Sequence, residues 1–279
     1  AFCAIFNIKT KMKKIIILNK KEGETPLEAM EAFRAKNKKY KDEKMTYAGR
    51  LDPLVSGLLL VLAGDARMQK EKYTKLSKEY KFTVLFGFAT DTYDILGKIT
   101  NHNILSRSRK SVMLSLLKKK IKVNLKFFTG KFIQKYPMYS SKTIAGKPLF
   151  TYARTGKVVE GREHEVYVKS LKFLKLSKIS SKKLLENIER RIKKVKGPAR
   201  NAKGIAFAGG DFRQEEILKI WRKNLSVKHR VFNTASFHIK CGSGTYVRAI
   251  ANDLGQRIGI PSLALTIKRT KIGKWRQVE

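Results

Sequence analysis

The chain has 279 residues with 62 Lys or Arg and 22 Asp or Glu, which gives a formal net charge of +40 and a pI near 10.3. There is no apolar run long enough for a membrane span, and its two cysteines and four scattered histidines form no disulfide framework or metal-ligand pattern. We therefore expect a soluble, cytoplasmic monomer without a metal or a membrane contact, and with a polyanionic partner such as nucleic acid.

The first third of the chain contains both strand and helix patterns. Residues 15–18 predict a strand, and Pro26 opens a helix predicted over residues 27–35. The apolar run at 58–63 predicts a buried segment, and the alternation at 81–88 predicts a further strand.

Residues 178–196 form a basic segment with apolar residues at helical spacing, which predicts an amphipathic helix. Such a helix either packs peripherally by its apolar stripe, which is the commoner case, or faces RNA with its basic side. Asp211 is expected to cap a second helix over 212–221.

The C-terminal part completes the predicted fold. Residues 231–241 alternate as a strand, with Phe237 and Ile239 on one face, and a helix over 247–258 and a strand over 266–273 follow. Because strands and helices mix without strict alternation, the sequence predicts an α+β fold with a mixed, largely antiparallel sheet.

The most informative segment, from Gly49 to Gly57, reads Gly-Arg-Leu-Asp-Pro-Leu-Val-Ser-Gly. Its glycines permit unusual backbone angles and Pro53 fixes the direction of the chain, so this loop can aim the side chain of Asp52. An isolated Asp-Pro pair more often just caps the element that follows. Three later sequence blocks favour the functional interpretation.

These blocks are Lys-Glu-Tyr-Lys at 78–81 with Gly-Phe-Ala-Thr-Asp-Thr-Tyr-Asp at 87–94, Gln-Lys-Tyr-Pro-Met-Tyr-Ser-Ser-Lys at 134–142 with Tyr-Ala-Arg-Thr-Gly at 152–156, and Cys-Gly-Ser-Gly-Thr-Tyr-Val-Arg at 241–248. In this order, and together with the Asp52 loop, they resemble the TruB-type tRNA pseudouridine synthases. The resemblance extends from about residue 15 to about residue 275 and leaves a gap near 178–228.

The resemblance implies a pseudouridine synthase catalytic domain over residues 12–279. Within it, a basic RNA-binding insertion is expected at about 98–165 and a family-atypical insertion at about 178–228. Residues 1–11 precede Met12, a more natural start, and are expected to be an N-terminal extension. The C-terminal RNA-binding (PUA) module that many family members carry is expected to be missing.

The resemblance also implies the reaction, which converts uridine to pseudouridine in the T-loop of tRNA, at tRNA position 55, without a cofactor. The uridine is flipped out of its stack, and Asp52 acts as the nucleophile. Arg248 is expected to pair with Asp52 and keep it ionised and oriented. Tyr80 is expected to lie against the flipped base; without the resemblance it would be interpreted as a core aromatic residue.

Further positions that match the family imply contacts with the substrate. They are Tyr47, Gly49, Arg50, Lys78, Asp91, Tyr136, Met138, Tyr139, Lys142, Tyr152, Arg154 and Tyr246. Tyr47 departs from the family, which often has a histidine there. This difference affects the expected positioning of the substrate more than the bond-breaking chemistry, and a tyrosine can still stack or donate a hydrogen bond.

The distribution of charge points to RNA independently of these motifs. Between Asp94 and Glu160 there are 15 Lys or Arg and no acidic residue, and aromatic residues such as Tyr136 and Tyr152 are interleaved with the basic ones. This combination suits neutralisation of a phosphate backbone together with stacking on unpaired bases. The alternative is a solvated, lysine-rich insertion with no specific partner.

Two interpretations from other functional classes are also compatible with a basic chain. An RNA-binding chaperone of tRNA folding, with little or no turnover, would use the same cleft without needing the carboxylate of Asp52. A basic structural protein of the ribosome would need no Asp52 loop at all, and it would co-sediment with ribosomes.

Overall fold

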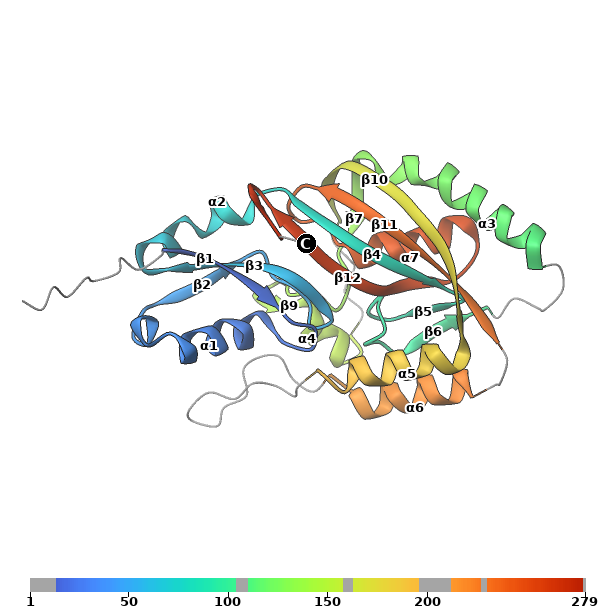
Figure 1. Ribbon diagram of the computed structural model, residues 1–279, viewed down its shortest axis with the longest axis horizontal. Coiled ribbons are helices and arrows are strands. Elements are labelled where there is room, and N and C mark those ends of the chain that lie inside the picture. The colour runs from blue at the N-terminus through green and yellow to red at the C-terminus, as the bar shows by residue number, and fades with distance from the viewer. Residues whose placement is uncertain (1–13, 104–109, 158–162, 196–211, 227–229, 278–279) are drawn as a thin grey trace, which may run out of the picture.

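The computed structural model describes residues 14–103, 110–157, 163–195, 212–226 and 230–277 (Figure 1). Its helices are α1 (Pro26–Lys36), α2 (Lys70–Thr74), α3 (Lys110–Asn124), α4 (Leu149–Arg154), α5 (Ser181–Ile192), α6 (Gln214–Leu225) and α7 (Val247–Ile258). Its strands are β1 (Ile15–Lys20), β2 (Met45–Ala48), β3 (Val55–Ala63), β4 (Lys78–Phe86), β5 (Phe88–Thr90), β6 (Ile99–His102), β7 (Gly130–Lys135), β8 (Thr143–Ile144), β9 (Lys147–Pro148), β10 (Glu163–Ser180), β11 (Val231–Cys241), β12 (Ser262–Ile272) and β13 (Trp275–Arg276).

Nine strands of the described residues form one sheet, whose main path runs β1–β3–β12–β4–β11–β10–β7. Strand β2 pairs with β3, and β13 pairs with β12. The pair of β3 with β12 is parallel, and the other pairs of this sheet are antiparallel. The prediction of an α+β fold with a mixed, largely antiparallel sheet is therefore confirmed.

Helices cover both faces of the sheet. On β4, Val84 and Phe86 belong to a core that includes residues of α3 and α7, whereas Leu85 belongs to a core that includes residues of α5 and α6. Since successive side chains of a strand point to opposite faces, these two helix pairs lie on opposite sides of the sheet (Figure 1). In the part of the chain that the structure describes, no helix has both the length and the apolarity to cross a membrane.

Several predicted elements have the expected bounds. Strand β11 and helix α7 coincide with the predictions at 231–241 and 247–258, and Phe237 and Ile239 share the buried face of β11. The predicted helix at 27–35 lies within α1, where Thr25 and Glu28 form a capping box. Residues 1–11 lie outside the described residues.

Other predicted bounds were wrong. The strand predicted at 81–88 begins earlier, because Lys78 is buried and Glu79 forms ion pairs with neighbouring strands, and it ends before Gly87, which has a φ of 108°. Strand β12 begins at Ser262 rather than at 266. Residues 178–180 of the predicted helix belong instead to β10, whose pairing with β11 continues to Ser180.

The predicted start of the second helix was also wrong. Helix α6 begins at Gln214, and Arg213 occupies its N-cap position with a φ of 55° and without a capping side-chain bond. Asp211, the predicted cap, lies outside the described residues. The apolar stripe of α5 is packed, since Leu184, Ile188 and Ile192 are fully buried, which agrees with a peripheral helix.

Gly57 allows β3 and β12 to pair in parallel directly after the Asp52 loop. It lies opposite Arg269 in the register and has a φ of 105°. A Cβ atom at this position would lie 2.1 Å from the carbonyl oxygen of Arg269. A residue larger than glycine would therefore push apart the two strands that hold the loop.

We predict that Gly57→Ala lowers the free energy of unfolding by about 2–4 kcal/mol, because it adds steric overlap to an unfavourable backbone conformation. Gly259→Ala is the matched control, since Gly259 has a φ of 75° but nothing within 4 Å of an added Cβ. It should cost only about 1–2 kcal/mol. Urea unfolding measures both changes, and equal losses would contradict the close approach at Gly57.

Candidate active site

Asp52 lies in the loop between β2 and β3, and contacts on both sides of it hold this loop. The amide of Val55 donates to the carbonyl of Asp52 at 3.0 Å, which forms a tight turn. The next carbonyl, that of Pro53, accepts from the amide of Gly23 at 2.9 Å and from Nζ of Lys20 at 3.1 Å. The backbone around Asp52 is thus fixed to the segment between β1 and α1.

Arg248 connects Asp52 to two other segments of the chain. Its Nε lies 2.8 Å from Oδ2 of Asp52, and the Arg248 side chain is 3% exposed, against 36% for Asp52. Its Nη1 donates to the carbonyl of Thr92 and its Nη2 to the carbonyl of Tyr139, each at 2.7 Å. The guanidinium is therefore held in one orientation by three acceptors.

Two carboxylates balance the buried charge of Arg248. Burial opposes this charge, but the nearby Asp52 and Asp94 outweigh it, so that the pKa of Arg248 lies above its usual value. Asp94 accepts from Oγ1 of Thr92 at 2.7 Å and from the amide of Leu96 at 2.9 Å. Burial raises the pKa of Asp94 in spite of these bonds and of the nearby arginine.

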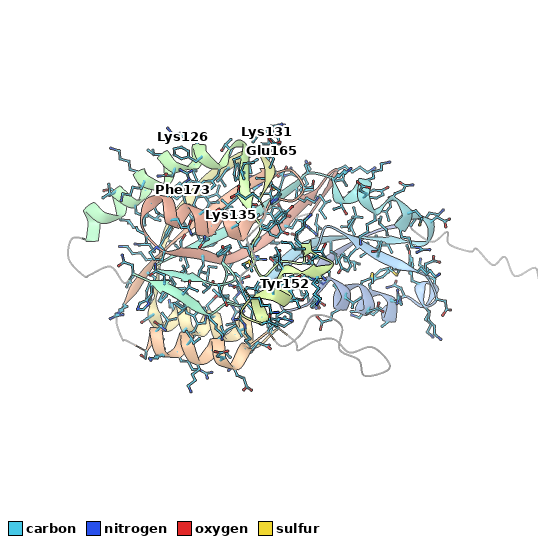
Figure 2. The ribbon with its side chains drawn as sticks, turned by 180° about the vertical axis from the view of Figure 1, so that it is seen from behind. Lys126, Lys131, Lys135, Tyr152, Glu165 and Phe173 are labelled. Atoms are coloured by element: carbon cyan, nitrogen blue, oxygen red, sulfur yellow. The ribbon has the colours of Figure 1, made fainter. Side chains whose placement is uncertain are left out.

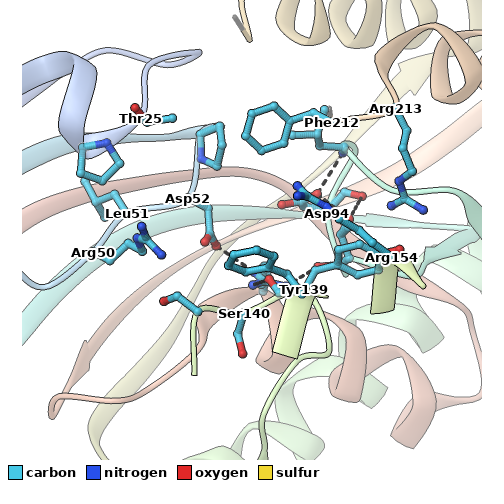
Figure 3. Close-up of a pocket in the computed structure, with 17 residues that line it drawn as sticks. Thr25, Arg50, Leu51, Asp52, Asp94, Tyr139, Ser140, Arg154, Phe212 and Arg213 are labelled. Atoms are coloured by element: carbon cyan, nitrogen blue, oxygen red, sulfur yellow. Dashed lines mark hydrogen bonds and ion pairs between the residues drawn. The ribbon is translucent and has the colours of Figure 1, made fainter. Parts of the chain in front are cut away.

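Asp52 lies between two pockets and lines both. The pocket that we call the Phe212 pocket also contains Pro26, Asp94, Phe150, Arg154, Phe212 and Arg213 (Figure 3). The second, which we call the Tyr80 pocket, contains Lys78, Tyr80, Thr245, Tyr246, Ile267 and Arg269. A ligand in either pocket can therefore reach the carboxylate of Asp52.

Buried polar groups form the floor of the Tyr80 pocket. Arg269 is 1% exposed, and it donates to the carbonyl of Leu58 at 2.7 Å and to the carbonyl of Gly49 at 3.0 Å. It lies opposite Tyr80 in the pairing of β12 with β4. Burial raises the pKa of Tyr80, and burial together with the charge of Arg269 lowers the pKa of Lys78 to about 8.

The structure gathers part of the predicted substrate-binding set around Asp52. Gly49, Lys78 and Tyr246 line the Tyr80 pocket, Tyr139 and Arg154 line the Phe212 pocket, and Arg50 lines both. The predicted residues outside both pocket linings are Tyr47, Asp91, Tyr136, Met138, Lys142 and Tyr152.

Three of these outer residues contact neighbouring parts of the chain. The ring of Tyr136 stacks on His164 at 3.9 Å between centroids, and Nζ of Lys142 lies 5.3 Å from the Tyr136 ring. The hydroxyl of Tyr152 donates to the carbonyl of Ile144. Contacts of Tyr136, Lys142 and Tyr152 with a substrate stay predictions.

Tyr47, at the position where the family often has histidine, also lies outside both pockets. Its hydroxyl accepts a hydrogen bond from Nη2 of Arg50 at 3.4 Å, and Nζ of Lys70 lies 6.0 Å from its ring. Since Arg50 lines both pockets, Tyr47 contacts the site through this arginine.

Sequence reasoning missed several residues that build the site. Gln134 is 1% exposed, and its side chain accepts from the amide of Tyr246 at 2.8 Å and donates to the carbonyl of Tyr246 at 3.2 Å. Gln134 belongs to the block at 134–142 that resembles the family, so its position could have suggested a role in the site. Arg269, Phe212 and Arg213 stood outside the blocks, and nothing local in the sequence marked them.

Basic residues also follow the edge of the sheet formed by β7 and β10 (Figure 2). Lys131 on β7 lies 3.1 Å from Glu165 on β10, and Lys135 lies 3.8 Å from Glu163. The lysines of β7 are thus partly compensated by the glutamates of the neighbouring strand.

We predict a pH dependence of stability that is due to Lys78. Because its folded-state pKa of about 8 lies below the ordinary lysine value of 10.5, protonation disfavours the folded state. Wild type should therefore gain stability over Lys78→Met as the pH rises from 8 to 10.5. The gain should be on the order of 1–3 kcal/mol. Denaturant unfolding across this range measures it, and Lys81→Met, an exposed lysine of the same strand, controls for the lost charge. A difference that does not change with pH would contradict the assignment.

The chain is similar to proteins of known family. A model described as the TruB family pseudouridylate synthase N-terminal domain matches residues 37–198. The tRNA pseudouridine synthase B of Ligilactobacillus salivarius is 29% identical over 262 residues, which are 94% of this chain and 68% of the relative. The tRNA pseudouridine synthase B of Wigglesworthia glossinidia brevipalpis is 29% identical and covers 86% of this chain. That of Aquifex aeolicus is 27% identical and covers 94% of this chain.

The chain spans 54% to 69% of the length of these three relatives. Among solved structures, a chain of a Cbf5–Nop10–Gar1 complex has a TM-score of 0.52 at 18% identity, covering 95% of this chain and 50% of that one, which supports the fold. Because the family model matches more than half of its residues, the chain belongs to the TruB family of pseudouridylate synthases.

Proposed function

We propose that the chain isomerises uridine to pseudouridine in tRNA, at the T-loop uridine at position 55. Membership in the family and the names of the relatives support the reaction and the class of RNA. The observation that carries the proposal is the ion pair between Asp52 and the buried Arg248, placed where two pockets meet. An ionised, oriented carboxylate at the base of a cleft suits a nucleophile.

In the proposed reaction, the carboxylate of Asp52 attacks an electrophilic carbon of the ribose or of the base, and the bond between N1 and C1′ breaks. The base turns and a bond forms between C5 and C1′. The bond between Asp52 and the substrate carbon breaks, which regenerates the carboxylate, and the proton on C5 leaves while N1 gains a proton. The atoms of uridine and pseudouridine are the same, so the isomerisation consumes no second substrate. Arg248 binds Oδ2 of Asp52, which leaves Oδ1 to face the substrate.

We place the flipped uracil in the Tyr80 pocket. The buried Tyr80 offers an aromatic surface next to Asp52, and Lys78 and Tyr246 supply polar groups around it. Burial raises the pKa of Tyr80, so its hydroxyl stays protonated near neutral pH and can take part in hydrogen bonding.

The tRNA itself is proposed to lie along the basic insertion at about 98–165. The net charge of +40 supplies attraction for the phosphate backbone, and the acid-free stretch between Asp94 and Glu160 includes Tyr139 and Arg154 of the Phe212 pocket. Tyr136, Met138, Lys142 and Tyr152 would contact the stem-loop farther from Asp52.

We predict that Asp52→Asn lowers the rate of pseudouridine formation in an unmodified tRNA transcript by at least about a thousandfold, because the amide cannot act as the nucleophile. The affinity for tRNA should stay within about threefold, since most of it comes from phosphate contacts. Asp65→Asn is the control. It removes the same charge, but from a side chain that is 98% exposed. Its rate should equal that of wild type.

Product and binding are measured on the same preparations at one salt concentration, and the modified position is mapped by chemical labelling. Full activity of Asp52→Asn would refute its role as nucleophile. Tight binding of tRNA with no product from wild type would favour the chaperone interpretation. Product at a uridine outside the T-loop would leave the reaction intact and refute the proposed position.

A further inference from the structure

Part of the Phe212 pocket is built by a segment that matched no family block. Phe212 and Arg213 directly precede α6 and line the pocket together with Asp52 (Figure 3). They belong to the stretch at 178–228 that we interpreted as an insertion. The family match ends at residue 198, so the wall opposite Arg50 and Leu51 comes from residues beyond it.

Arg213 makes two specific contacts at the pocket. Its Nη1 lies 2.8 Å from Oδ2 of Asp91, and its guanidinium lies 4.6 Å from the centroid of the Tyr139 ring. The other oxygen of Asp91 accepts the amide of Lys98 at 2.8 Å, so the carboxylate that binds Arg213 is itself fixed. The φ of 55° at Arg213 is unfavourable for this residue, and these contacts offset its cost.

Tyr139 links Arg213 to the catalytic pair. Its ring lies under the guanidinium of Arg213, while its carbonyl accepts from Nη2 of Arg248. Arg248 in turn binds Asp52. A shift of Tyr139 would remove one of the three acceptors that orient Arg248 and would let the carboxylate move away from its position.

The insertion is attached to the fold through other contacts. Trp221 is fully buried, and its Nε1 donates to the carbonyl of Ile95 at 3.1 Å. Arg191 is 3% exposed and binds Glu22 at 2.7 Å. The insertion would therefore stay docked without the side chain of Arg213, so that a substitution of this residue tests its role in the site.

We propose that Arg213 is a positioning residue of the reaction, which the insertion supplies and which acts through Tyr139 to hold Arg248 and Asp52 in place. This proposal rests on the proposed function. In this proposal the insertion covers one face of the sheet and also supports catalysis through Arg213.

The test compares single-turnover pseudouridine formation at saturating tRNA transcript for wild type, Arg213→Ala and Arg222→Ala. Arg222 is the matched control because it lies on α6, is 51% exposed, binds Glu189 and lines neither pocket. We expect Arg213→Ala to lower the rate by about 10- to 100-fold, because a misplacement of about 1 Å at a reacting group has an effect of this size. Its Kd for tRNA should stay within about threefold of that of Arg222→Ala.

Arg213→Lys should recover part of the rate, since a lysine keeps the ion pair with Asp91 but loses the planar stacking on Tyr139. A purely structural role would lower the melting temperature of Arg213→Ala below that of Arg222→Ala and leave the saturated rate of the folded protein unchanged. If the alanine variant does not fold, Arg213→Gln takes its place under the same criteria.

The outcomes separate the two proposals. No pseudouridine from wild type would refute the proposed function, and this inference with it. An active wild type with equal saturated rates for Arg213→Ala and Arg222→Ala would refute the inference alone. A normal saturated rate with a weakened Kd would also refute it, because Arg213 would then be a contact for the substrate rather than a positioning residue.

Discussion

The guanidinium of Arg248 is the group around which the site is organised. A charge that is 3% exposed is stable only if acceptors surround it. Asp52, Thr92 and Tyr139 supply these acceptors from three segments that are far apart in the sequence. Burial of one arginine thus requires the loop before β3, the turn after β5 and the segment after β7 to meet at one point.

The same arginine also sets the orientation of the aspartate in this cleft. Arg248 compensates Asp52 directly, and Asp94, whose pKa burial raises, lies close enough to act on the same arginine. Both pockets then meet a carboxylate whose position is set by the protein before a substrate arrives. This arrangement favours chemistry over simple binding, because orientation is fixed in advance.

The sequence predicted those parts of the site that short segments determine. Asp52 and Arg248 lie in compact blocks with glycine or proline neighbours. Tyr80 is buried, as expected of a core aromatic residue, and it also lines a pocket, while its contact with the base stays a prediction. Arg269 could not be predicted, because an arginine within a strand normally faces solvent and only the fold shows its acceptors. The predicted strand began only at Lys81, whereas the structure buries Lys78 and starts β4 there.

The bonds of Arg269 also set the order in which the site can form during synthesis. Its acceptor at Gly49 lies 220 residues earlier in the chain, and Arg248 lies 196 residues after Asp52. A nascent chain on the ribosome therefore carries the Asp52 loop long before its partners exist. The contacts of the loop with Lys20 and Gly23 involve residues that are made before it, whereas those with Arg248 and Arg269 need the last part of the chain, including β12, which lies between β3 and β4. The site is therefore completed late and by contacts of long sequence separation.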